Sequence, residues 1–61
     1  MTKAARFENT RHNRARVEAV EELLAGDSWL SDLARDDVNW WLNYGYNERD
    51  AKIKAAMALG Y

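Results

Sequence analysis

Residues 42–50, with the sequence LNYGYNERD, contain the signals that end one helix and begin the next. Gly45 stands just past an apolar periodic segment, where glycine is preferred because it enters the left-handed conformation without a Cβ clash. Asn47 follows, and its side-chain oxygen can accept from the free amides of a first helical turn. Asp50, three residues later, completes a variant of the reciprocal capping pattern. The stretch predicts a helix end at Gly45 and a helix start near Asn47.

The other two glycines mark further helix ends. Gly26 and Gly60 also close apolar periodic segments, and the N-cap candidates Asp27 and Ser28 follow Gly26. We expect all three glycines to have positive φ. Proline is absent and no segment alternates as a strand would, so the predicted fold is all-α. A small three-helix bundle is expected over residues 10–61, after a basic N-terminal arm at 1–9, with helices over roughly 10–25, 28–44 and 48–59.

Length and composition limit the classes of function. Sixty-one residues allow one domain with a thin stability margin. Without cysteine there are no disulfides or thiolate sites, and the single His12 does not make a zinc site alone. Ser28 and Ser31 have no base nearby in sequence, and the dispersed glycines form no phosphate-binding loop. We expect no enzymatic activity, no metal and no cofactor.

The sequence also carries no signal for the membrane or for export. No apolar run approaches the roughly 20 residues that span a bilayer. The first seven residues lack the apolar stretch of a secretory signal. The expected location is therefore cytoplasmic.

Apolar residues at helical spacing predict the core. The side chains expected to be most buried are Val17, Val20, Leu23, Leu30, Leu33, Val38, Trp41, Leu42, Ile53, Met57 and Leu59. The many alanines of the third helix indicate close approach between helices. If the first two helices form an antiparallel hairpin about Gly26, Arg16 lies beside Asp36 and Asp37.

Basic residues are concentrated at the start of the chain. Residues 1–16 carry five cations against Glu8, a net charge of +4, whereas residues 17–26 and 27–50 carry −3 and −4. Cations at a helix start oppose the macrodipole at a cost of about 0.3–1 kcal/mol each, so local helix stability does not explain this pattern. One interpretation is pairing with the acidic second helix, which explains only Arg16. The others are a solvated charged face, or a site at which Arg6, Arg11 and Arg14 bind nucleic acid. The candidate residues for nucleic acid are Arg6, Arg11, Arg14, Arg16, Arg49, Lys52 and Lys54.

Residues 10–16, with the sequence TRHNRAR, resemble the arginine-rich peptides with which lambdoid phage antitermination proteins bind hairpin RNA. This segment has fewer arginines than those peptides and turns acidic at Glu18. Residues 31–45 are similar to a repressor-type helix-turn-helix, but the turn is missing and the would-be recognition helix is acidic. The third helix, with Arg49, Lys52 and Lys54, is the better candidate for contact with DNA.

Five large aromatic residues occur within residues 29–46: Trp29, Trp40, Trp41, Tyr44 and Tyr46. Adjacent helical residues point about 100° apart, so Trp40 and Trp41 cannot both face the core. The spacing from Val38 assigns the core to Trp41. Trp40 then shares a flank with Trp29, Leu33 and Tyr44, together with Asp36 and Asp37. Either the third helix covers this flank, or it is an exposed aromatic and acidic patch.

The favoured function is a small non-enzymatic binding module, a regulator or inhibitor that docks on a larger cellular machine. Its protein-binding residues are expected to be Trp29, Asp36, Asp37, Trp40 and Tyr44, where acidic groups would steer a basic partner. By type alone, short cysteine-free accessory proteins of phages have this size. One alternative is RNA or DNA binding through the arginine-rich segment, and another is a structural subunit that assembles as a homo-oligomer.

Overall fold

The computed structural model describes residues 4–61, which form three helices: α1 (Arg11–Ala25), α2 (Trp29–Tyr44) and α3 (Glu48–Ala58). The prediction of an all-α three-helix bundle is confirmed, and every helix boundary lies within one residue of the expected position. Residues 4–61 contain no strand. Residues 1–3 of the predicted basic arm lie outside the described residues. None of the helices in the described part of the chain is both long enough and apolar enough to cross a membrane.

All three helices begin with the same capping device. The side chains of Thr10, Ser28 and Asn47 each accept a hydrogen bond from the amide three residues further on, at 3.0, 3.3 and 2.7 Å. Such bonds satisfy amides that have no partner within the helix. The starts of the helices are therefore set by short-range interactions.

The helix ends are of two kinds. Gly45 and Gly60 have φ of +130° and +97°, as expected. In each case the glycine and the following tyrosine donate their amides back to carbonyls of the last turn, the Schellman arrangement. The expectation for Gly26 is wrong: its φ is −90°, an extended backbone that other residues also adopt. Glycine is favoured there by space, because an added Cβ would lie 3.1 Å from the Ser31 hydroxyl.

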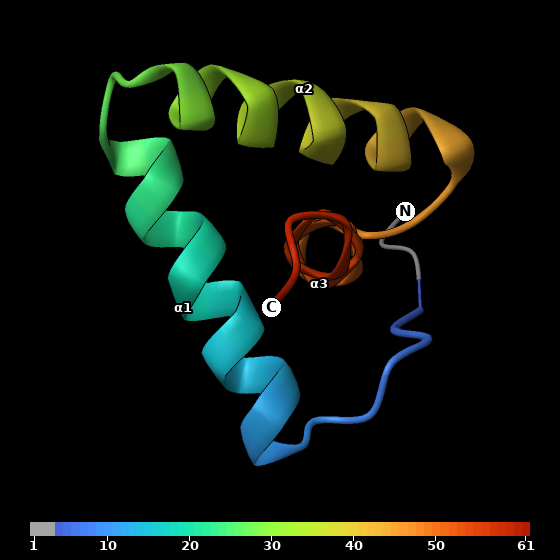
Figure 1. The fold of residues 1–61 in the computed structure, drawn as a ribbon. Coiled ribbons are helices and arrows are strands. Elements are labelled where there is room, and N and C mark those ends of the chain that lie inside the picture. Colours follow the sequence, from blue (N-terminus) through green and yellow to red (C-terminus); the bar gives the residue numbers. More distant parts are fainter. Residues whose placement is uncertain (1–3) are drawn as a thin grey trace.

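α1 and α2 do not form the expected antiparallel hairpin. Figure 1 shows that they meet at the turn around Gly26 and diverge, and that α3 lies in the angle between them. Arg16 consequently has no ion pair with Asp36 or Asp37 within residues 4–61. The chain preceding α1 passes along the open side of this angle (Figure 1). The hairpin prediction failed because it ignored the space that a third helix needs.

The core consists mainly of small side chains. The buried hydrophobic residues are Val20, Ala34, Val38, Ala51, Ile53, Ala55 and Ala56. Successive helical positions point in different directions, so the buried residues of α3 mean that this helix is covered on several sides. Alanine lets the surrounding elements approach it closely.

The predicted core was therefore right in part. Val20, Val38 and Ile53 are buried, but Leu33 and Met57, also expected inside, are exposed. Trp41 packs against the core and is less exposed than Trp40, as the spacing predicted. The main omission was the alanines, which are four of the seven buried hydrophobic residues.

Candidate functional site

The largest exposed apolar side chains of α2 lie on one face of the helix. The exposed fractions are 73% for Trp29, 46% for Leu33, 57% for Trp40 and 64% for Tyr44. At about 100° of rotation per residue, these four positions fall within an arc of about 60°. We call this set the aromatic face.

The aromatic face points away from the core. The buried residues of α2 are Ser31, Ala34 and Val38, and the helical rotation places them on the opposite side. The interpretation in which α3 covers the flank is therefore wrong. α3 packs on the inner side of α2, so the aromatic side chains remain in contact with solvent.

The aromatic rings at the end of α2 form a nearly parallel series. Trp40 stacks on Tyr44 at 5.6 Å between ring centroids and 14° between planes. Tyr44 stacks on Tyr46 at 5.9 Å, and Tyr46 stacks on Phe7 at 6.1 Å. Trp41 meets the rings of Trp40, Tyr44 and Tyr46 edge-on. These contacts hold the exposed rings of Trp40 and Tyr44 in a defined arrangement.

Acidic residues border the aromatic face. Asp36 is exposed and Asp37 is half-buried. Within residues 4–61, neither carboxylate takes part in a hydrogen bond or an ion pair. Asp32 differs, because it pairs with Arg35 at 2.9 Å in an exposed i,i+3 contact. The free carboxylates lie where the sequence placed them, beside Trp40.

The N-terminal segment is attached to the helices rather than extended into solvent. The backbone N–H of Arg6 donates to the buried Asp50 carboxylate at the start of α3. The Arg6 guanidinium lies 4.8 Å from the centre of the Tyr46 ring, within the range of a cation–π contact. Arg49 donates to the carbonyls of Phe7 and Glu8 at 3.0 and 2.8 Å, and to Asp50 at 3.0 Å. The buried Asp50 was not anticipated, since the capping pattern indicates a helix start but not its burial.

Most of the basic residues proposed for nucleic acid have partners within the fold. Arg14 donates to the Asn9 carbonyl at 2.8 Å. Arg16 donates to the Tyr61 carbonyl and the Asn13 side chain at 3.1 and 2.9 Å. The Lys54 ammonium lies 4.4 Å from the centre of the Trp41 ring.

Arg11 and Lys52 complete the basic set. Arg11 is exposed and Lys52 is half-buried, and neither has a polar or ring contact within the described residues. The basic residues thus lie on both α1 and α3. Internal pairing with the second helix does not explain Arg6, Arg11 or Arg14. The folded chain provides contacts for Arg6 and Arg14 but none for Arg11 within the described residues.

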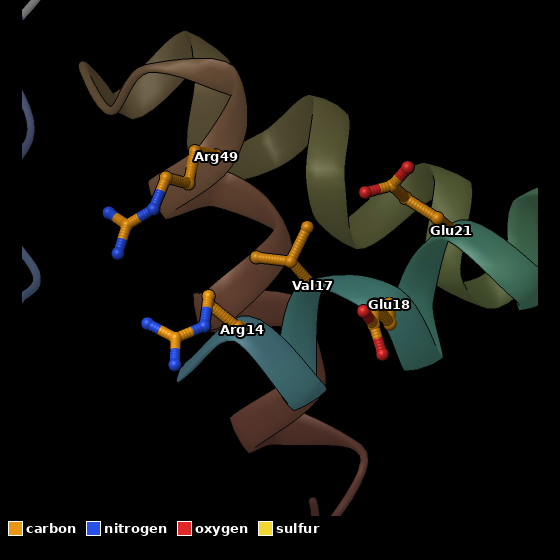
Figure 2. Close-up of a pocket in the computed structure, with 5 residues that line it drawn as sticks. All are labelled: Arg14, Val17, Glu18, Glu21 and Arg49. Carbon is orange, nitrogen blue, oxygen red and sulfur yellow. The ribbon is translucent and has the colours of Figure 1, made fainter. Parts of the chain in front are cut away.

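A shallow cavity of 290 Å³ lies between α1 and α3 and is lined by Arg14, Val17, Glu18, Glu21 and Arg49. Figure 2 shows the two guanidinium groups on one side of Val17 and the two carboxylates on the other. Both arginines already donate to carbonyls of the N-terminal segment. The cavity is best understood as the place where that segment joins the helices.

A second, mainly apolar cavity of 220 Å³ is lined by His12, Ala15, Arg16 and Tyr61. At this cavity Tyr61, the last residue of the sequence, lies beside the first turns of α1. Across residues 4–61, no three or more histidine, cysteine or acidic side chains gather as metal ligands would. The aromatic face remains the most distinctive surface of this part of the chain.

Comparison with protein families, curated proteins and solved structures finds no match for this chain. The function must therefore be inferred from the residues themselves, above all from the aromatic face and its two free carboxylates.

Proposed function

We propose that this domain is a small non-enzymatic binding module that docks on another protein through the aromatic face of α2. The observation that carries the proposal is the exposure of four large apolar side chains on one narrow arc, opposite the core. Contiguous exposed apolar patches on soluble domains mark interaction sites more often than isolated apolar residues do. We further propose that the domain acts as a regulator or inhibitor of a larger assembly.

The energetics agree with a binding role. Covering the exposed part of one such ring removes on the order of 100 Å² of apolar surface from water, about 2.5 kcal/mol at roughly 25 cal/mol per Å². Tryptophan and tyrosine are also the residue types enriched at binding hot spots. Because Trp40 and Tyr44 are held by ring stacking, little side-chain freedom is lost on binding.

The nucleic-acid alternative has weaker support after folding. Its premise was that Arg6, Arg11 and Arg14 lack acidic partners within the chain. Arg6 instead contacts the Tyr46 ring and Arg14 donates to the Asn9 carbonyl, whereas Arg11 has neither kind of contact within residues 4–61. Phosphate binding also requires several cations on one surface. The two carboxylates beside Trp40 would repel a nucleic-acid backbone there.

Affinity capture with matched variants tests the proposal. The wild-type domain, the double variant Trp40→Ala/Tyr44→Ala and the control Arg11→Ala/Arg14→Ala are immobilised and exposed to lysate with and without nuclease. We expect specific proteins on the wild type and on the arginine control, retained after nuclease, and lost from the aromatic variant. The lost affinity should exceed about 2 kcal/mol, the hot-spot range. Capture that needs the arginines and disappears with nuclease would favour the alternative.

A further inference from the structure

We infer that the occupant of the aromatic face is an amphipathic helix of a partner protein, apolar along one stripe and carrying lysine or arginine on both sides of it. This inference rests on the proposed function, since it names the partner of the same face.

Carboxylates lie on both borders of the aromatic face. By helical rotation, Asp36 falls about 20° outside one edge of the arc and Asp37 about 20° outside the other. Neither has an intramolecular partner within residues 4–61. The only cation on α2 is Arg35, which pairs with Asp32 away from the arc. A partner with basic groups on both sides of an apolar stripe would therefore match the charges on both borders.

The end of α2 carries no cation of its own. Its last turn contains no basic residue, and the Arg6 guanidinium lies beside its C-cap, 3.9 Å from where a Cβ on Gly45 would stand. Arg6 and Lys54, from other elements, already lie over the rings of Tyr46 and Trp41. The exposed rings of Trp40 and Tyr44 thus offer aromatic surface for a further cation, supplied by the partner.

The shape of the aromatic face suits a helix. Positions 29, 33, 40 and 44 repeat at the spacing by which one helix packs along another. The stripe runs for about 22 Å at 1.5 Å per residue, roughly four helical turns. A partner helix of similar length could cover all four side chains.

Symmetry argues against a second copy of this chain as the occupant. In a two-fold pair the same patch meets itself, and the midpoint of the 29–44 stripe falls between Asp36 and Asp37. The symmetric pairing would bring four carboxylates together in the centre of the interface. Like charges in that position oppose association, whereas basic residues would favour it.

The test uses two synthetic helical peptides of about sixteen residues with the same leucine stripe, one bordered by lysine and the other by glutamate. Binding to the full chain is measured by calorimetry at low and moderate salt, with sedimentation to follow the oligomeric state. We expect the lysine peptide to bind at least about tenfold more tightly than the glutamate peptide, with affinity falling as salt rises. The chain itself should sediment as a monomer.

Three variants assign the interaction to its residues. Trp40→Ala should weaken binding of the lysine peptide at least about tenfold. Asp36→Asn/Asp37→Asn should weaken it about threefold to tenfold and reduce its salt dependence. Glu22→Gln/Asp27→Asn removes the same charge from exposed positions elsewhere and should leave the affinity unchanged. Helical circular dichroism confirms that each variant is folded.

The outcomes separate the two proposals. Suppose that both peptides bind equally, that Trp40→Ala weakens the binding, and that the Asp36/Asp37 variant does not. This result would overturn the basic partner but would still support the aromatic face as the binding site. Failure of both peptides to bind, or a dimer that Trp40→Ala dissociates, would also overturn the basic helix. If Trp40→Ala binds the lysine peptide as tightly as the wild type does, both proposals are contradicted.

Discussion

The two faces of α2 distribute side-chain size in opposite ways. Its buried face presents Ser31, Ala34 and Val38, whereas three of its most exposed residues are Trp29, Trp40 and Tyr44. A helix that uses its hydrophobic residues for folding would have the reverse arrangement. The position of this core therefore cannot be inferred from the apolar content of the helix alone. Close approach of α3 selects small residues inside, and the large residues remain available for a partner.

The largest expected effect comes from truncating Ile53, the largest fully buried side chain of the described residues. Ile53 on α3 is fully buried, so Ile53→Ala should lower the free energy of unfolding by about 2–5 kcal/mol. A domain this small has little reserve, and the variant could be unfolded at room temperature. Urea denaturation of Ile53→Val, expected to cost about 0.5–1.5 kcal/mol, keeps the measurement within range. An Ile53→Ala domain as stable as the wild type would contradict the burial of this side chain.

The next effect concerns the attachment of the N-terminal segment. Asp50→Ala removes the buried carboxylate that accepts from the Arg6 amide and the Arg49 guanidinium. The cost should be about 2–3 kcal/mol, because hydrogen bonds to a charged group are lost and a buried donor is left unpaired. Asp36→Ala, an exposed acid without intramolecular partners, is the control and should change stability by less than about 0.5 kcal/mol. Equal effects of both variants in thermal denaturation would show that this attachment contributes nothing.

A pair of neighbouring residues tests the contrast on α2 directly. Ala34 is fully buried, so Ala34→Leu overpacks the inner side and should destabilise by about 1–3 kcal/mol. Leu33 is nearly half exposed, so Leu33→Ala should lower the free energy of unfolding by less than about 1 kcal/mol, although it removes most of a leucine side chain. Chemical denaturation of both variants checks the order. A larger loss of stability in Leu33→Ala than in Ala34→Leu would mean that Leu33, and not Ala34, lies on the buried face of α2.

The smallest stability effect is expected on the aromatic face. Trp29 is 73% exposed, and Trp29→Ala should alter the free energy of unfolding by less than about 0.5 kcal/mol. Trp40→Ala should cost somewhat more, about 0.5–1.5 kcal/mol, because it also removes ring contacts with Trp41 and Tyr44. Differential scanning calorimetry distinguishes the two. A large loss in Trp29→Ala would assign that side chain to the core.

Much of the candidate site could be predicted from periodicity. The choice between Trp40 and Trp41 followed from the angle between adjacent residues, and the grouping of Trp40 with Trp29 and Tyr44 followed in the same way. Whether α3 covered that group could not be read from the sequence. Coverage depends on which side of α2 receives α3, and both arrangements have the same helical spacing.

The basic residues show the opposite case. Their surplus is visible in the sequence, but many of their partners are backbone carbonyl groups, which every residue carries and no pattern marks. Arg49 reaches the Phe7 carbonyl forty-two positions away, and Arg16 reaches the Tyr61 carbonyl forty-five positions away. Contacts of that kind arise only when the chain has folded, so counting acids near each arginine could not predict them.

The sequence by itself determined the helices of this protein and their ends, because capping bonds join residues no more than a few positions apart. Ser28 and Asn47 start helices, and Gly45 and Gly60 end them, with bonds contained in the adjoining turn. Only the tertiary structure decided the extended conformation of Gly26, the angle between α1 and α2, and the burial of alanines in place of tryptophans. These properties depend on where α3 lies relative to the other two helices. That position is set by the sum of many contacts between distant segments, and no local pattern contains it.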